Sequence, residues 1–245
     1  MTETPDAPGA PETPTGPTPE PPQGPPPGGE PPAPPPPPPP PTAVSPTGDY
    51  PVRVDAERQA EYNRFLPLVK WLLAIPHYFV LLFLFIGVFF AKIVAFFAVL
   101  ITGRYPEGIF NFVTGALRWS WNVTAYVYLL TDTYPPFALD QDPTYDAQLE
   151  ITYPADGVNR WRPLVHWLLI IPYALVAGVL SWLAGIVAFI GVFVILFTKD
   201  LPEGMFKMIL IPYRWQYRAT VYTLFMVTRY PPFVWDEPAA VSEPR

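Results

Sequence analysis

Residues 63–76 read NRFLPLVKWLLAIP, and residues 159–172 read NRWRPLVHWLLIIP, so one motif occurs twice at a separation of 96 positions. The same register continues without a gap to two Tyr-Pro-Pro-Phe segments at 134–137 and 230–233, and 27 of the 75 aligned positions are identical. Agreement of this extent within one chain indicates an internal duplication, which has to be recognised before secondary structure is assigned.

The duplicated region and the segment before it differ sharply in composition. The chain has 245 residues, 38 Pro, no Cys and a net charge of −6. Residues 1–48 contain 22 of the prolines and no aromatic residue, Lys or Arg, so every aromatic residue lies in 49–245. The lack of Cys excludes disulfides and Cys-ligated metal or redox sites. The negative charge argues against a nucleic-acid binder that uses a basic patch.

The N-terminal segment, residues 1–48, is predicted to be disordered because it has almost no apolar side chains to bury. Its run of eight prolines from Pro34 to Pro41 favours an extended polyproline II helix. The run is interpreted either as a spacer or as a ligand for a proline-binding groove on a cytoplasmic protein. Residues 236–245 are also predicted to be disordered. The first residues are not basic and do not resemble a secretory signal.

Each repeat contains a long apolar stretch. Residues 77–102 are almost wholly apolar apart from Lys92, and residues 173–198 are the equivalent segment. As a helix, such a segment is about 39 Å long, more than the roughly 30 Å of a hydrocarbon core. After a loop with Gly and Pro, residues 108–131 are predicted to form a second span. Residues 65–75, with Lys70 and Trp71, are predicted to form a short helix at the membrane interface, where Lys can snorkel.

We therefore predict an all-α integral membrane protein made of two tandem helical hairpins, with two spans in each repeat and four in total. The first repeat covers residues 49–140 and the second 145–235. Alternating residues at 52–55 and 149–152 are compatible with a short strand before each repeat. A turn near Gly87, which would give three spans per repeat, is the alternative.

An even number of spans has a consequence for topology. It would place equivalent ends, such as Arg64 and Arg160, on one face of the membrane. That face would carry most of the basic residues near the membrane, which predicts a multi-pass plasma membrane protein with both termini in the cytoplasm. The basic residues counted there are Arg53, Arg58, Arg64, Lys70, Arg160, Arg162 and Arg229, against Arg104, Lys199 and Lys207 in the opposite loops.

Several motifs agree in order and spacing with a known family. Ile-Pro-His at 75–77, Thr-Gly-Arg-Tyr-Pro-Glu-Gly at 102–108, Arg-Trp at 118–119 and Tyr-Pro-Pro-Phe at 134–137 resemble the bacterial domain-of-unknown-function family 4389. The resemblance covers roughly residues 50–137 and 149–233 and implies two copies of the domain. The second copy departs from the pattern at 199–201 and at Tyr173, which replaces His77. The family has no established activity, so the resemblance implies an architecture and no reaction.

Basic residues recur in the second predicted span of each repeat. Arg118 and Arg214 are equivalent, and their neighbours at helical spacing give one polar stripe on a helix face. An Arg within hydrocarbon costs about 2.5–3.5 kcal/mol on insertion scales. The stripe is interpreted either as a site for an anion or lipid headgroup, or as an interfacial helix whose arginines reach lipid phosphates. The candidate contacts are Arg118, Arg214, Arg218 and Lys207.

The remaining polar residues suggest structural roles. Glu107 and Glu203 are predicted to open these helices and to interact with the positive helix end. The Tyr-Pro-Pro-Phe segments are predicted to end the helices and to anchor them at the interface. His77 and His166 are not equivalent and lack ligands at metal-binding spacing, so no metal is expected. The role of Lys92 stays open.

No catalytic motif or phosphate-binding loop occurs, so no catalytic residue and no cofactor are expected. The sequence favours a membrane-anchored scaffold or adaptor with a cytoplasmic proline-rich tail. The alternative is a lipid-binding protein, pore or carrier that uses the arginine stripe and contacts anionic lipids. An intramembrane enzyme is the third and least favoured class.

Overall fold

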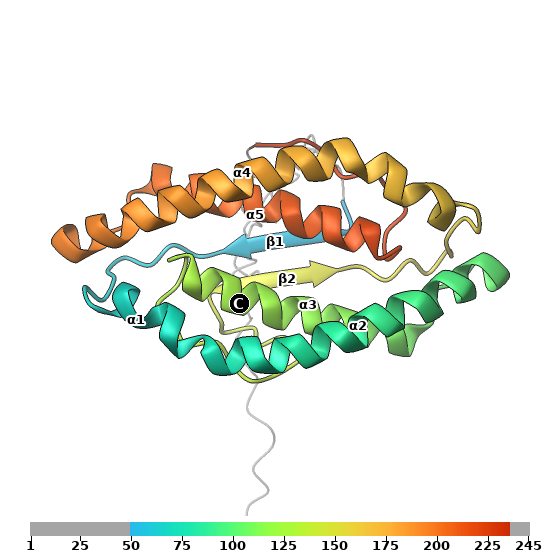
Figure 1. The fold of residues 1–245 in the computed structure, drawn as a ribbon, viewed down its shortest axis with the longest axis horizontal. Helices are drawn as coiled ribbons and strands as arrows, with labels where there is room; N and C mark the ends of the chain where they lie inside the picture. Colours follow the sequence, from blue (N-terminus) through green and yellow to red (C-terminus); the bar gives the residue numbers. More distant parts are fainter. Residues whose placement is uncertain (1–49, 236–245) are drawn as a thin grey trace, which may run out of the picture. The chain divides into compact units, whose positions relative to one another are not determined.

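The computed structural model describes residues 50–235, and the segments predicted to be disordered, 1–48 and 236–245, lie outside the described residues. The protein is mostly helical, as predicted, with one short strand ahead of each repeat (Figure 1). The elements in chain order are β1 (Val52–Ala56), α1 (Leu66–Leu73), α2 (Ile75–Thr102), α3 (Glu107–Val127), β2 (Ala147–Ile151), α4 (Arg162–Thr198) and α5 (Glu203–Thr223).

The two strands pair with each other and make the symmetry of the fold explicit. β1 and β2 are antiparallel, with Val52 opposite Ile151 and Ala56 opposite Ala147. The middle residues of the two five-residue strands, Val54 and Leu149, therefore face each other. Exchanging the strands leaves the register unchanged, so a pseudo-two-fold axis passes through this pair, perpendicular to the sheet.

Contacts far from the sheet obey the same axis. The amide of Tyr62 donates to the carbonyl of Lys199 at 2.9 Å, and the amide of Val158 donates to that of Gly103 at 2.8 Å. Tyr62 and Val158 are equivalent positions in the two repeats, and so are Gly103 and Lys199, so the two hydrogen bonds are equivalent. Each long helical segment, α1–α2 or α4, therefore begins beside the end of the other, and Figure 1 shows α2 and α4 running in opposite directions.

The antiparallel arrangement corrects one prediction. Arg64 lies at the start of the first long segment and Arg160 at the start of the second, so the two lie at opposite ends of the structure. The arrangement of the repeats as translated copies, on which the shared membrane face was based, is therefore wrong, and the membrane side of the two arginines stays a prediction. The repeats are instead related by a rotation about an axis that crosses the long helices.

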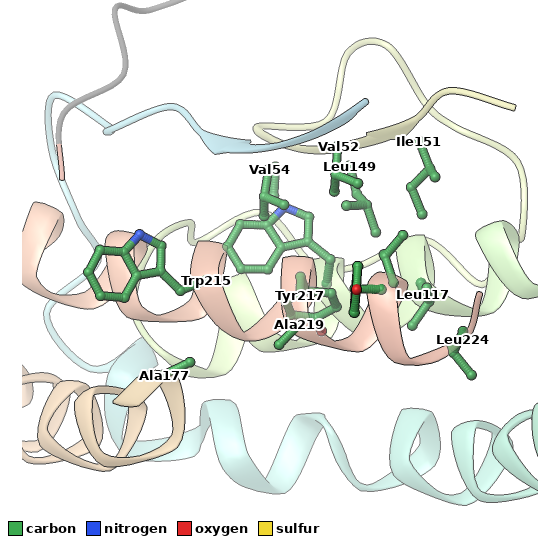
Figure 2. Packing of buried hydrophobic residues seen from close by; sticks show 14 of the residues in the cluster. Val52, Val54, Leu117, Leu149, Ile151, Ala177, Trp215, Tyr217, Ala219 and Leu224 are labelled. Carbon is green, nitrogen blue, oxygen red and sulfur yellow. The ribbon is translucent and has the colours of Figure 1, made fainter. Parts of the chain in front are cut away.

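The elements form layers along this axis. The inner face of the sheet, with Val52, Val54 and Leu149, packs on α3 and α5 (Figure 2). The long helices α2 and α4 pack on the other side of α3 and α5, where Ala177 of α4 is buried. The equivalent residues Trp121 and Tyr217 meet in the α3–α5 layer, with ring centroids 5.3 Å apart. The layer between sheet and long helices is therefore the main core.

The long helices are continuous where a turn was considered. α2 passes through Gly87 without a break, which contradicts the three-span alternative. Within residues 50–235, two helical stretches are long and apolar enough to cross a membrane, Leu66–Thr102 and Arg162–Thr198. The helices α3 and α5, predicted as the second span of each repeat, are not among them.

Each long segment buries only one narrow stripe. Residues of the stripe recur at intervals of three, four or seven positions, a nearly heptad spacing that keeps them on one helix face. The other residues of both helices are exposed or half-buried, and nearly all of them are apolar. The buried residues are Pro67, Lys70, Ala74, His77, Leu81, Val88, Ala95 and Val99 in α1–α2, and Pro163, His166, Ile170, Tyr173, Ala177, Ala184, Ala188, Gly191 and Ile195 in α4.

Candidate functional site

Arginines of the predicted stripe lie beneath the sheet. Arg118 of α3 donates from Nε to the carbonyl of Leu149 at 3.0 Å, and Arg214 of α5 donates from Nε to the carbonyl of Val54 at 2.9 Å. The two bonds are exchanged by the pseudo-two-fold axis, because their acceptors are the central residues of the two strands. The same side chain therefore makes the same contact in both repeats.

The strand pairing explains why these carbonyls need donors. Hydrogen bonds from Glu57 N to Asp146 O and from Thr152 N to Pro51 O, both 2.8 Å, lie at the two ends of the strand pair. Because hydrogen-bonded and non-hydrogen-bonded pairs alternate along antiparallel strands, these two bonds show which residues point their carbonyls away from the partner strand. The carbonyls of Val52, Val54 and Leu149 then point to the open edges, where a two-stranded sheet has no further strand. Arg218 donates from Nη2 to the carbonyl of Val52 at 3.3 Å. The guanidinium groups thus satisfy edge carbonyls that would otherwise be buried without a partner.

Negative and aromatic groups of the protein complete the surroundings of these arginines. Arg214 Nη2 lies 2.5 Å from Asp55 Oδ1, with side chains 6% and 45% exposed. The Arg218 guanidinium lies 5.1 Å from the ring centroid of Tyr50, a cation–π contact. The structure brings Arg118, Arg214 and Arg218 to the sheet, and each has a protein partner there. Anion binding by these residues stays a prediction.

The fourth candidate contact, Lys207, lines the same surface hollow as Arg214 and Asp55 but pairs within its own helix. Lys207 is on the exposed side of α5, where its Nζ is 2.7 Å from Glu203 Oε1. This hydrogen bond lowers the pKa of the Glu203 carboxyl below its usual value. Glu107 and Glu203 are the first residues of α3 and α5, as predicted. Both positions favour a negative charge, because the first turn exposes unpaired N–H groups.

The Tyr-Pro-Pro-Phe segments do not end the helices. α3 stops at Val127 and α5 at Thr223, and shortly afterwards Leu129 and Phe225 adopt positive φ angles of 67° and 63°. A left-handed residue just past a helix end closes the helix. The helices therefore end before Tyr134 and Tyr230 are reached, and the prediction for these segments is wrong on this point.

Instead, these segments return to the long helices and build equivalent aromatic clusters. Phe137 stacks on His77 of α2 at 4.0 Å between ring centroids, and Phe233 lies 4.5 Å from Tyr173 of α4. Trp119 of α3 donates from Nε1 to His77 Nδ1 at 2.9 Å. Histidine 77 is thus a buried packing residue, and the recurrence of Arg-Trp and Tyr-Pro-Pro-Phe was the sequence signal for this cluster.

Comparison with known proteins agrees with this repeated geometry. A family model described as Domain of unknown function (DUF4389) matches residues 67–138 and again 160–234. The chain belongs to this family. No curated protein and no solved structure matches it. Each matched segment runs from the start of a long helix through the polar helix to the Tyr-Pro-Pro-Phe cluster, whereas both strands lie outside the matched segments.

The first DUF4389 repeat also contains a buried lysine. Lys70 is 1% exposed, and its Nζ lies 2.7 Å from Asp132 Oδ1 and 2.6 Å from the carbonyl of Thr131. Its ammonium also faces the ring of Tyr126 at 4.9 Å. The expectation that Lys70 snorkels to the interface is wrong, because it turns inward to a carboxylate 62 residues later. In the second repeat, His166 takes this position and contacts the carbonyl of Tyr222.

Two hollows lie on the surface of the DUF4389 unit. One, of about 250 Å³, is apolar apart from Lys92, whose Nζ lies 5.6 Å from the ring of Phe225. The other, of about 300 Å³, lies between β1 and α5 and includes Asp55, Arg58, Lys207 and Trp235. Among residues 50–235, no group of three or more His, Asp or Glu side chains is placed to hold a metal ion.

Proposed function

We propose that this DUF4389 protein is a membrane-embedded scaffold. Its folded region, residues 50–235, is the anchor, and its proline-rich N-terminal segment binds a cytoplasmic protein. The observation that carries the anchor role is the apolar surface of the long helices. Only 17% and 22% of the residues in their most apolar windows are buried.

Burial elsewhere in the fold does not account for this surface. The exposed fractions of Phe79, Phe90, Trp182, Phe189 and Phe197 range from 61% to 75%. Apolar surface left in water costs about 25 cal/mol per Å², and soluble monomers rarely expose contiguous apolar patches above a few hundred Å². Lipid acyl chains would remove this cost along both helices at once.

The ends of the described region support a common side for both termini. Trp215 donates from Nε1 to the carbonyl of Val234 at 2.9 Å, and Trp235 lines the hollow beside Asp55 of β1. Tyr50, at the other end, lies against Arg218 of α5. The chain therefore enters and leaves the folded region beside β1 and α5. This placement supports the proposal that both termini are in the cytoplasm.

The alternative of an anion pore or carrier has less support. Its central residues, Arg118 and Arg214, already donate to strand carbonyls, and Arg214 contacts a carboxylate. These contacts give both guanidinium groups a role in supporting the sheet, so their recurrence in the two repeats is explained without an anion. A scaffold requires no further role for them.

The anchor role is tested by fractionating cells that express the full chain or residues 46–245. Both proteins should stay with membranes after alkaline carbonate extraction and should be released by detergent. Release of residues 46–245 by carbonate would contradict the anchor role.

The scaffold role is tested by proximity labelling with the full chain and with a variant whose Pro34–Pro41 run is replaced by Gly and Ser. The scaffold proposal expects cytoplasmic neighbours that depend on the prolines. Identical neighbours for both proteins would contradict it.

A further inference from the structure

We infer that the protein inserts into one leaflet of the bilayer, with α1, α2 and α4 lying in the membrane plane among the acyl chains. In this arrangement α3 and α5 lie at headgroup depth and the two-stranded sheet faces water. The inference rests on the proposed membrane role and specifies the membrane partner: a single leaflet rather than a full bilayer crossed by spans.

The length of the apolar segments is the first argument. Leu66–Thr102 and Arg162–Thr198 have 37 residues each. At 1.5 Å per residue each is about 55 Å long, nearly twice the roughly 30 Å hydrocarbon core. Crossing that core over the whole segment would require a tilt of roughly 57°, beyond the 0–40° seen for membrane helices. A helix in the membrane plane has no such length limit.

The position of the sheet is the second argument. The pseudo-two-fold axis passes through the centre of the sheet and exchanges the two antiparallel long segments. If these segments crossed the bilayer, the axis would lie at its midplane and the sheet would lie there too. The outer face of the sheet carries Arg53 opposite Glu150, both exposed. Open sheet edges and charged side chains facing lipid are not tolerated at that depth.

The distribution of polarity is the third argument. Exposed side chains are charged or polar on the sheet, as with Arg53 and Glu150, and on the outer parts of α3 and α5, as with Asn111 and Lys207. Exposed side chains along α2 and α4 are aliphatic and aromatic. Polarity therefore changes along the axis, from sheet to long helices. If the axis lies along the membrane normal, the charged sheet faces water, α3 and α5 lie among the headgroups, and the apolar long helices lie among the acyl chains.

The starts of the long segments fit this orientation. Trp71 and Trp167 are equivalent and are 61% and 60% exposed. Tryptophan favours the headgroup region, and two equivalent Trp residues at opposite ends would hold both helices at equal depth. A second copy of the chain is a poorer occupant, because it would cover only one side of helices that expose apolar side chains on every side except the buried stripe.

Single cysteines test the inference, since the chain contains no natural Cys. Arg64→Cys and Arg160→Cys are a matched pair, because both residues are exposed and equivalent and lie at opposite ends of the structure. A membrane-impermeant thiol reagent is added to intact cells and, separately, to inverted vesicles. The inference expects both cysteines to react from one and the same side. Arg53→Cys, on the sheet, should react from that side as well.

Depth supplies a second readout. A fluorophore on Phe83→Cys, an exposed position near the middle of the Leu66–Thr102 segment, should be quenched by lipids labelled on the acyl chains, and a fluorophore on Arg53→Cys should not. Reaction of the Arg64 and Arg160 cysteines from opposite sides, with carbonate-resistant protein, would overturn the single-leaflet arrangement and leave the anchor role intact. Release of the protein by carbonate, as a monomer or a dimer, would overturn both.

Discussion

Replacing Arg214 by Leu tests whether the arginines support the sheet or bind lipid. The change removes the donor to the Val54 carbonyl and the partner of Asp55. A buried carbonyl left unsatisfied costs about 1–3 kcal/mol. The Asp55 contact adds less than a buried ion pair would, because Asp55 is 45% exposed and solvent screens the charges. We expect a loss of about 2–4 kcal/mol of unfolding free energy.

The assay is thermal unfolding of the purified protein in lipid nanodiscs, with binding of anionic lipid measured on the same samples. For a chain of this size, 1 kcal/mol of unfolding free energy corresponds to about 2–4 °C in the midpoint, so the midpoint should fall by roughly 4–16 °C. Arg214→Lys should be nearly as destabilising, because one ammonium cannot reproduce the two-pronged guanidinium contact. The matched control is Lys207→Leu on the same helix, which should leave the midpoint almost unchanged because solvent screens its exposed ion pair with Glu203.

One combination of results would show that Arg214 does not support the sheet. If Arg214→Leu unfolds at the wild-type temperature but no longer binds anionic lipid, the guanidinium serves a ligand and does not support the sheet edge. Loss of stability with unchanged lipid binding is the expected result. Arg118→Leu should cost less, about 1–2 kcal/mol, because Arg118 is only partly buried.

Three further predictions use the same unfolding assay. Lys70→Met should cost about 3–5 kcal/mol, because it leaves Asp132 without its ammonium; adding Asp132→Asn should restore part of the loss, and no restoration would show that the carboxylate is not the cause. Gly103→Ala should destabilise the protein by about 1 kcal/mol, because the φ angle at this position is 72°. Lys199→Gly at the equivalent position, where φ is 60°, should stabilise it by a similar amount. Changes of the same sign in both variants would contradict this prediction. Burial raises the pKa of Tyr62 to about 12 in the folded protein. The neutral phenol therefore stabilises the fold fully below pH 10, and about 3 kcal/mol of unfolding free energy is lost as the pH rises from about 10 to 12. In Tyr62→Phe the unfolding free energy should fall less steeply over that range, and a pH profile like that of the wild type would exclude Tyr62 as a source of the loss.

Secondary structure was largely predictable because its causes are local. Long apolar runs specify the helices α2 and α4, and the gapless duplication transfers each assignment from one repeat to the other. Glu107 and Glu203 mark helix starts because the preference for carboxylates there depends only on the first turn. The short strands followed from alternation of buried and exposed residues, although β2 begins two residues earlier than predicted.

The contacts of the arginines and of Lys70 depended on partners far away in the chain. A polar stripe on α3 and α5 was visible as a spacing, but its acceptors are strand carbonyls 31 and 160 residues away. Lys70 was placed at an interface because its neighbours are apolar and aromatic, and a carboxylate 62 residues later turned it inward. Side-chain direction in such cases is decided by which partner the fold brings within reach.

The sequence by itself determined that the chain is duplicated, which segments are helical and that two of them are long and apolar enough to cross a membrane. Only the tertiary structure decided that the repeats are related by a two-fold axis perpendicular to a shared sheet. This relation places the starts of the two long helical segments at opposite ends of the structure, and it places the sheet, α3 and α5 on one side of the long helices. The physical reason is that a duplication makes two units alike but leaves their relative placement open. That placement depends on the pairing of two five-residue strands about 95 residues apart, each too short to specify its partner alone.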